Sequence, residues 1–177
     1  YMNRYAGVNP ANGDALWYTK DGEVTTELRE ADKVMTGKSY IAPWQGGFGT
    51  TLTWKAWSLN TQFSWMADRW LYNGQFSMYN QSKRLLYDRW KKPGDITDIP
   101  RHGVYAQHDT RFLEDASFLR LKNLMLSYTL PQNWLKKTKF ISSARLYGQA
   151  QNLLTFTKFT GLDPETNSNM YQAAYPM

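Results

Sequence analysis

GGFGTTLTWKAWSLNTQFSWMADRWLY, residues 46–72, is the stretch whose alternating pattern decides the fold. We interpret it as two antiparallel strands joined by a two-residue turn at Lys55 and Ala56, because the side chains of a strand alternate between its faces. Lys-Ala is not a favoured turn pair, but a loop two residues longer would keep the same register. One face then carries Trp54 opposite Trp57, Leu52 opposite Leu59, Thr50 opposite Thr61, and Phe48 opposite Phe63. The other face carries Thr53 opposite Ser58, Thr51 opposite Asn60, Gly49 opposite Gln62, and Gly47 opposite Ser64.

This separation of faces fits two environments. In a soluble sandwich the apolar face is the core and the polar face meets water. In an outer-membrane barrel the apolar face meets lipid and the polar face lines the lumen. Three features favour the barrel: Trp and Tyr lie near strand ends, the polar row has hardly a charge before Asp68, and the connections alternate between short and long. The expected lipid-facing residues are Phe48, Leu52, Trp54, Trp57, Leu59, Phe63 and Trp65, and the expected lumen-facing residues are Thr51, Asn60, Gln62 and Ser64.

The composition narrows the possible classes of protein. The 177 residues are 16% aromatic, with eight Trp and twelve Tyr. No run approaches the roughly 18 apolar residues of a membrane-spanning helix, so a membrane protein with this sequence has to be a β-barrel. The absence of Cys excludes disulfides and thiolate chemistry. The net charge of +6 is scattered along the chain, so we expect no nucleic-acid partner.

The remaining elements follow from periodicity and turn residues. Further strands are expected at residues 1–8, 15–20, 117–130 and 140–152, with a β-bulge near Lys122 and Asn123, a short turn at 131–139 and a loop from Leu153 onwards. The longest connection, residues 73–115, contains a helical pattern formed by Met78, Tyr79, Leu85, Leu86 and Trp90. Pro93 and Gly94 are expected to end that helix.

No catalytic set stands out in this sequence, and we expect no enzyme. His102 and His108 have no familiar metal-ligand spacing, and the neighbours Glu114 and Asp115 would face opposite ways in a strand. We expect no cofactor; Asp95 and Asp98 could bind calcium in a loop, although no EF-hand ligand series surrounds them. Aromatic rings beside amides and charges suit a ligand such as a sugar, so the candidate substrate-binding residues are Trp90, Arg101, Tyr105 and Gln107. The alternative is that these side chains pack their own loop or contact a protein partner.

Four passages resemble a known family. They are YAGVNPANGDALWY (5–18), RWKKPGDITDIPR (89–101), SFLRLKNLMLSYTLP (117–131) and RLYGQAQNLLTFTKFTGLDPE (145–165). Together they resemble the C-terminal barrel region of SusC/RagA-type TonB-dependent outer-membrane transporters. The resemblance implies an all-β fold: an antiparallel transmembrane segment of a 22-stranded barrel, with long extracellular loops, one containing a short helix. Residues 1–177 would be the C-terminal portion of the barrel, without the plug and the last strand.

The same resemblance implies a function and a set of partners. The whole protein would import a nutrient, glycan or peptide, through the cell outer membrane as a multi-pass β-barrel. Its partners would be a SusD-like surface lipoprotein, the remainder of the barrel and plug, outer-membrane lipid, the ligand, and the TonB complex acting through the absent plug. The alternative that the residues leave open is a soluble, aromatic-rich β-sandwich that binds carbohydrate.

Overall fold

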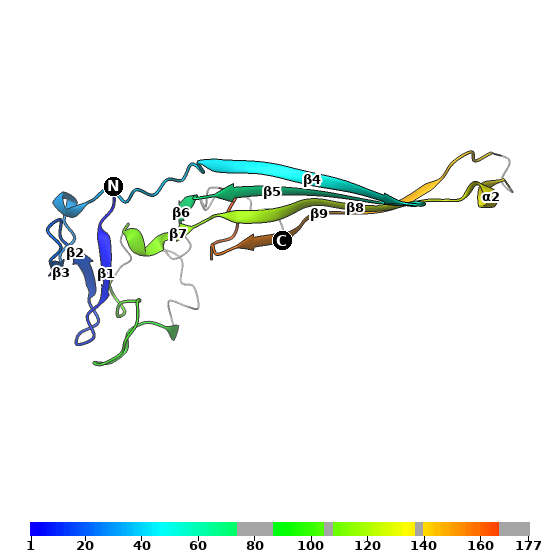
Figure 1. Cartoon of the computed structure of the whole chain (residues 1–177). Coiled ribbons are helices and arrows are strands. Elements are labelled where there is room, and N and C mark those ends of the chain that lie inside the picture. Colours follow the sequence, from blue (N-terminus) through cyan, green and yellow to red (C-terminus); the bar gives the residue numbers. More distant parts are fainter. Residues whose placement is uncertain (74–86, 105–107, 137–139, 167–177) are drawn as a thin grey trace.

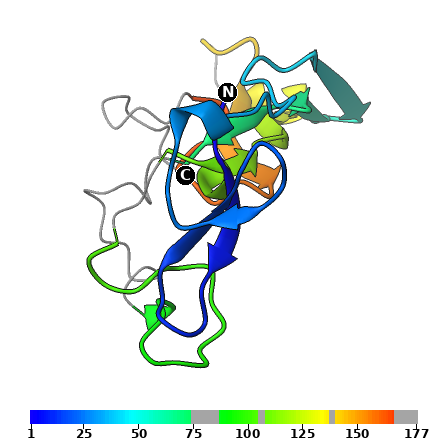
Figure 2. The same cartoon turned by 90° about the vertical axis from the view of Figure 1, so that its left-hand side faces the viewer.

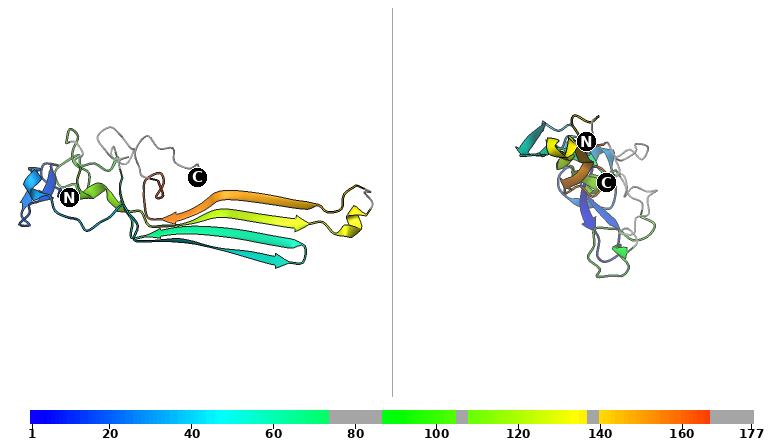
Figure 3. Two further views of the ribbon diagram at one scale, coloured as in Figure 1. Left: turned by 90° about the horizontal axis from the view of Figure 1, so that it is seen from above. Right: turned by 90° about the vertical axis from the view of Figure 1, so that its right-hand side faces the viewer.

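A long four-stranded antiparallel sheet dominates the structure, a computed structural model that describes residues 1–73, 87–104, 108–136 and 140–166 (Figure 1). Its strands are β4 (Trp44–Trp54), β5 (Trp57–Ala67), β8 (Phe118–Thr129) and β9 (Arg145–Thr157), in the spatial order β4-β5-β8-β9. Seen from above, the four strands run side by side from a folded lobe at one end to α2 (Gln132–Leu135) at the other (Figure 3). The lobe is defined as residues 1–43 and 87–112.

The lobe contains short elements only. A three-stranded sheet is formed by β1 (Arg4–Val8), β2 (Ala15–Tyr18) and β3 (Val24–Thr25), followed by the 3-10 turn η1 (Glu30–Asp32). A second 3-10 turn, η3 (Thr110–Phe112), leads into β7 (Leu113–Asp115), which pairs with β6 (Trp70–Tyr72). Figure 2 views the molecule from the lobe, with β1 and β2 in front of the large sheet. The β6–β7 pair ties together the two ends of the longest connection at the junction of lobe and sheet.

The predicted hairpin register is confirmed at every pair. Trp54 pairs with Trp57, Leu52 with Leu59 and Phe48 with Phe63, and the polar pairs alternate between them. The turn contains only Lys55 and Ala56, and Lys55 adopts a φ of 53°. The unfavourable turn pair is supported from outside the hairpin, because the Thr129 N–H donates to the Ala56 carbonyl at 2.8 Å.

The predicted bulge is also confirmed. Gln62 pairs with Asn123 and Phe63 with Leu121, so Lys122 is the extra residue of β8. The prediction for the fourth strand was wrong at both ends, since β9 begins at Arg145 rather than at residue 140 and continues past Asn152 to Thr157. Asn152 has a φ of 51° at a second bulge, which returns Leu154 and Phe156 to the apolar side. That change of phase explains why the alternation suggested a loop.

Most of the helical pattern in the longest connection cannot be compared, because Met78, Tyr79, Leu85 and Leu86 lie outside the described residues. Trp90 is described, and it lies outside any helix. Its N–H donates to the Ile99 carbonyl at 2.9 Å, next to a bridge between Arg89 and Ile99. The connection predicted as a short turn at 131–139 contains α2 and is longer than expected. Its two ends pair where the Leu130 N–H donates to the Ala144 carbonyl.

Most of the buried hydrophobic residues lie in the lobe and at its junction with the sheet. Asp109 is fully buried, and it accepts hydrogen bonds from Trp17 Nε1 at 2.9 Å and from the Arg111 N–H at 3.0 Å. The Arg111 guanidinium lies 4.3 Å from the Tyr5 ring centroid, and burial raises the pKa of Tyr5 to about 12. Leu71, Ala116 and Phe159 form a buried cluster at the junction. This core anchors the lobe to one end of the sheet.

Candidate functional site

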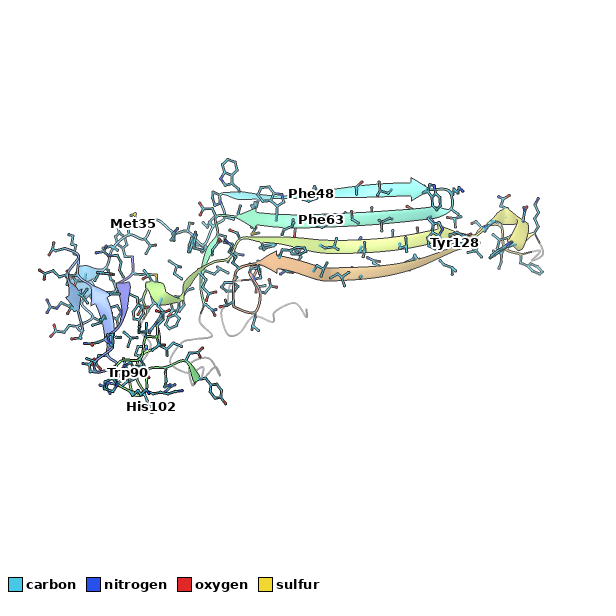
Figure 4. The ribbon with its side chains drawn as sticks, turned by 60° about the horizontal axis from the view of Figure 1, so that its bottom comes forward. Met35, Phe48, Phe63, Trp90, His102 and Tyr128 are labelled. Carbon is cyan, nitrogen blue, oxygen red and sulfur yellow. The ribbon has the colours of Figure 1, made fainter. Side chains whose placement is uncertain are left out.

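The large sheet has one apolar face, and in the described residues no second layer covers it. The rows across its four strands are Trp54–Trp57–Tyr128–Leu146, Leu52–Leu59–Leu126–Gly148 and Phe48–Phe63–Leu121–Leu154, with Trp65–Leu119–Phe156 beyond. The Phe48 and Phe63 rings stack at 5.0 Å (Figure 4). Leu52 is 60% exposed and Trp54 is 68% exposed. All seven residues predicted to face lipid therefore lie on one face, called here the apolar face.

The opposite face, called the polar face, carries a chain of hydrogen bonds with one residue from each strand. Gln149 Nε2 on β9 donates to Asn123 Oδ1 on β8 at 2.8 Å, and Asn123 Nδ2 reaches Asn60 Oδ1 on β5 at 3.4 Å. Asn60 Nδ2 then donates to Thr51 Oγ1 on β4 at 2.8 Å. The register also places Gln62 and Ser64 on this face, so the residues predicted to face the lumen share it.

A cluster of charges occupies the lobe end of the polar face. The return segment, residues 159–165, folds back from the end of β9 onto β8. Arg120 Nη2 lies 2.5 Å from Asp163 Oδ1, and Arg120 Nη1 lies 2.7 Å from Glu165 Oε2. Lys122 Nζ pairs with the same Glu165 carboxylate at 2.7 Å. The Arg120 side chain is only 4% exposed, so this ion pair is shielded from water.

Two further residues hold the return segment in place. Arg69 Nη1 donates to the carbonyls of Pro164 at 2.5 Å and of Glu165 at 2.9 Å, while its Nε donates to the Tyr40 carbonyl. Burial lowers the pKa of the Arg69 guanidinium, and the carboxylates of Glu165 and Asp163 oppose that shift. Glu114 accepts hydrogen bonds from the Thr160 N–H and hydroxyl, both at 2.8 Å. This cluster was not predicted from the sequence, where the available signal was two basic residues on a strand otherwise lined by neutral polar groups.

Trp90 lies in the lobe, away from the sheet (Figure 4). Arg101 lies in the same place, since the side chains of both residues approach Gly13. Trp90 Nε1 donates to the Pro10 carbonyl at 3.0 Å, and Arg101 Nε lies 2.9 Å from Asp14 Oδ1. Both side chains contact the turn at residues 9–14, so they join two segments far apart in the chain rather than packing only their own loop. Tyr105 and Gln107 lie outside the described residues. A ligand-binding role for these four residues stays a prediction.

The contact between Trp90 and Gly13 gives a testable stability prediction. Gly13 has a φ of 77°, and a Cβ there would lie 2.4 Å from the Trp90 ring. We expect Gly13→Ala to destabilise the lobe by more than the roughly 1 kcal/mol of backbone strain alone, as measured by urea unfolding and limited proteolysis. Gly22→Ala is the matched control, because Gly22 has a φ of 93° with nothing within 4 Å. Equal losses in the two variants would contradict the packing role of Trp90.

Four of the six titratable residues considered for metal binding or catalysis have structural partners. Asp95 Oδ2 accepts the N–H groups of Lys91 and Lys92, which lower the pKa of this carboxyl. The His108 ring lies 4.3 Å from the Tyr72 ring. Glu114 and Asp115 bind different partners, and Asp115 accepts the N–H and hydroxyl of Ser117, which lower its pKa. Within the described ranges, no three His, Asp or Glu residues are grouped to hold a metal, and calcium binding stays a prediction.

No helix among the described residues is long and apolar enough to cross a membrane. A long antiparallel sheet that exposes an apolar face and carries neutral polar groups on the other has the two-faced pattern of transmembrane barrel walls. The comparisons with known proteins agree with this class.

The chain is 34% identical over 160 residues to TonB-dependent receptor P3 of Formosa agariphila, a match covering 88% of this chain and 16% of that protein. Over 65 residues it is 37% identical to TonB-dependent receptor SusC of Bacteroides thetaiotaomicron, covering 37% of this chain and 6% of that protein. The structure of the RagAB peptide transporter superposes with a TM-score of 0.82 at 35% identity, over 93% of this chain and 20% of that chain. The RagAB peptide importer in its open-open state gives a TM-score of 0.79 at 36% identity, over 93% of this chain and 19% of that chain. No family model matches the sequence.

The chain belongs to the SusC/RagA-type TonB-dependent receptors and aligns with a segment of them. It spans 16% of the length of the Formosa receptor P3 and 20% of the RagAB transporter chain. These relatives are receptors and transporters rather than enzymes.

Proposed function

We propose that this chain is part of the barrel wall of an outer-membrane nutrient importer, the C-terminal portion of a longer receptor. Its apolar face would meet lipid and its polar face would line the lumen. The single observation that carries the proposal is the exposed apolar face of the large sheet, on which Phe48, Leu52 and Trp54 are each more than half exposed. A soluble sandwich would need a second sheet over these residues.

Strand length supports the same proposal. The four strands contain 11, 11, 12 and 13 residues, and a tilted transmembrane strand needs about 9–11. Trp57 and Tyr128 lie in contact at the end away from the lobe, with ring centroids 4.7 Å apart, where an interfacial aromatic belt is expected. The Lys55–Ala56 turn and the connection after β8 would then be periplasmic, and the lobe would be extracellular, since bacterial barrels have short periplasmic turns and long outer loops.

The importer would need partners that this chain does not contain. The outer edges of β4 and β9 pair with no strand in the described residues, and unpaired backbone groups in hydrocarbon cost several kcal/mol each. We therefore expect both edges to pair with the remaining strands of the barrel. A SusD-like lipoprotein would cover the outer opening, with contacts to the connection between β6 and β7, and the TonB complex would act through the plug. The similarity to SusC and to RagAB supports these partners; the nutrient would be a glycan or a peptide.

The experiment that tests the proposal is detergent extraction of outer membranes, followed by intact-mass measurement and identification of the co-purifying chains. We expect this sequence within a much larger polypeptide, or bound to further barrel segments, together with a lipoprotein. A monodisperse species of about 20 kDa that needs no detergent would reject the importer and favour the carbohydrate-binding module.

A further inference from the structure

Only positive charge is found at the end of the large sheet that lies away from the lobe (Figure 1). We call this region the far end and define it as residues 53–58 and 127–147, which are the β4–β5 turn with its flanking residues and the connection between β8 and β9. Its sequence contains no Asp or Glu, and its basic residues are Lys55, Lys136, Lys137, Lys139 and Arg145. The far end therefore has a formal charge of +5, whereas the 16 basic and 15 acidic residues elsewhere in the chain nearly cancel.

The described basic residues of the far end are held on adjacent segments and are not neutralised. The Thr129 N–H donates to the Ala56 carbonyl, and Thr129 pairs with Arg145, so the turn that contains Lys55 and the start of β9 both meet the end of β8. Lys55, Lys136 and Arg145 are exposed, and none of them makes an ion pair within the described ranges. A group of positive charges without acidic neighbours attracts anionic partners.

The far end is continuous with the apolar face. The last row across the four strands is Trp54–Trp57–Tyr128–Leu146. Lys55 Nζ lies 5.0 Å from the centroid of the Trp54 ring, so an ammonium group lies at the border of this face. Lysines at the ends of membrane-spanning segments place their charged groups in this way, with the apolar stem near hydrocarbon and the ammonium at the level of the lipid headgroups.

The connection beyond this border exposes large apolar side chains. It protrudes past the β4–β5 turn (Figure 3), and in it Trp134 is 65% exposed, Phe140 is 98% exposed and Ile141 is 48% exposed. Segments that lie in a membrane interface combine such side chains with Lys and Arg, and Trp is enriched at the headgroup level. An acidic soluble protein would match the charges of the far end, but its continuity with the apolar face favours a membrane surface.

We infer that the far end binds anionic phospholipids of the periplasmic leaflet, with its basic side chains on the headgroup phosphates and the exposed apolar side chains of the connection at the boundary with the acyl chains. The inference rests on the proposed barrel and its orientation, and it adds a preference for headgroup charge at one end of the barrel wall. A zwitterionic headgroup carries an ammonium group beside its phosphate, so the far end should prefer phosphatidylglycerol to phosphatidylcholine.

The test uses the full-length receptor in phosphatidylcholine nanodiscs that contain a small fraction of a photoreactive lipid. The two probes are phosphatidylglycerol and phosphatidylcholine with identical acyl chains, each with a diazirine near the glycerol backbone, and the cross-linked peptides are mapped by mass spectrometry. We expect the phosphatidylglycerol probe to label the far end about tenfold more than the phosphatidylcholine probe does. This preference should shrink at high salt, because ions screen exposed charges.

The variant Lys55→Gln/Lys136→Gln removes two of the exposed charges, and we expect it to lower the preference at the far end to about twofold. Lys91→Gln/Lys92→Gln is the matched control, since it removes two exposed lysines from the lobe and should leave the preference unchanged. Labelling of β4 and β5 by both probes shows that each variant is folded and inserted.

The outcomes separate this inference from the proposed function. Equal labelling of the far end by the two probes, with the strands labelled, overturns the preference for anionic lipid and leaves the importer intact. Labelled strands with an unlabelled far end overturn the membrane contact and favour an acidic periplasmic protein as the partner. A receptor whose strands neither probe labels overturns the importer and this inference together.

Discussion

Replacing Arg120 by methionine is expected to release the return segment and to lower the free energy of unfolding by about 3–5 kcal/mol. The reason is that Asp163, 3% exposed, would keep its charge in a buried position without the guanidinium at 2.5 Å. Urea titration of the receptor in detergent measures the loss, and limited proteolysis should show new cleavage within residues 159–165.

The double variant Arg120→Met/Asp163→Leu is the control for this prediction. Removing both charges leaves no unpaired ion, so we expect most of the stability to return. Arg145→Met on β9 provides a second control, because Arg145 is exposed and lies at the strand end away from the return segment. A loss below about 1 kcal/mol for Arg120→Met would show that the ion pair contributes little to the anchoring.

The second large effect is expected on the apolar face. Leu124 lies near the middle of β8 on this face, and Leu124→Arg should cost about 2–4 kcal/mol in the membrane, because the charge would lie near the bilayer midplane. Leu59→Arg, two residues from the turn end of β5, should cost less, because the penalty falls toward the interface. Urea unfolding in lipid vesicles measures both.

Met125→Arg is the matched control for the apolar face, since Met125 is the next residue of β8 and lies on the polar face opposite Asn60. It should cost little, because the polar face would meet the water of the lumen. A sandwich core predicts a different pattern: the penalty would follow burial against a second sheet and would show no dependence on depth. Equal penalties at Leu124 and Leu59 would therefore count against the membrane orientation.

Local alternation was sufficient to predict the β4–β5 hairpin and the bulged strand β8. The register from Phe48–Phe63 to Trp54–Trp57 and the bulge at Lys122 both follow from which residues are apolar, because a shift of one residue would exchange the faces. The same alternation assigned the residues to the two faces. The alternation did not predict β9 correctly, because the bulge at Asn152 exchanges the faces on which the following side chains lie. Along a single strand, such an exchange cannot be distinguished from the start of a loop.

The site residues were only partly predictable. Thr51 and Asn60 were placed on the polar face, but their hydrogen-bonded chain to Asn123 and Gln149 depends on the order of four strands. The charge cluster joins Arg120 to Asp163 across 43 residues. Trp90 and Arg101 were chosen for their chemistry, and the structure shows that their polar atoms are already engaged by residues 10 and 14.

By itself, the sequence determined which side chains lie on each face of the sheet and where the central hairpin turns, because both depend on the two-residue period of a strand and on adjacent residues. Only the tertiary structure decided that the return segment closes one end of the polar face and that β8 and β9 bulge at the same level. These features depend on contacts between segments far apart in the chain, whose pairing no local pattern specifies.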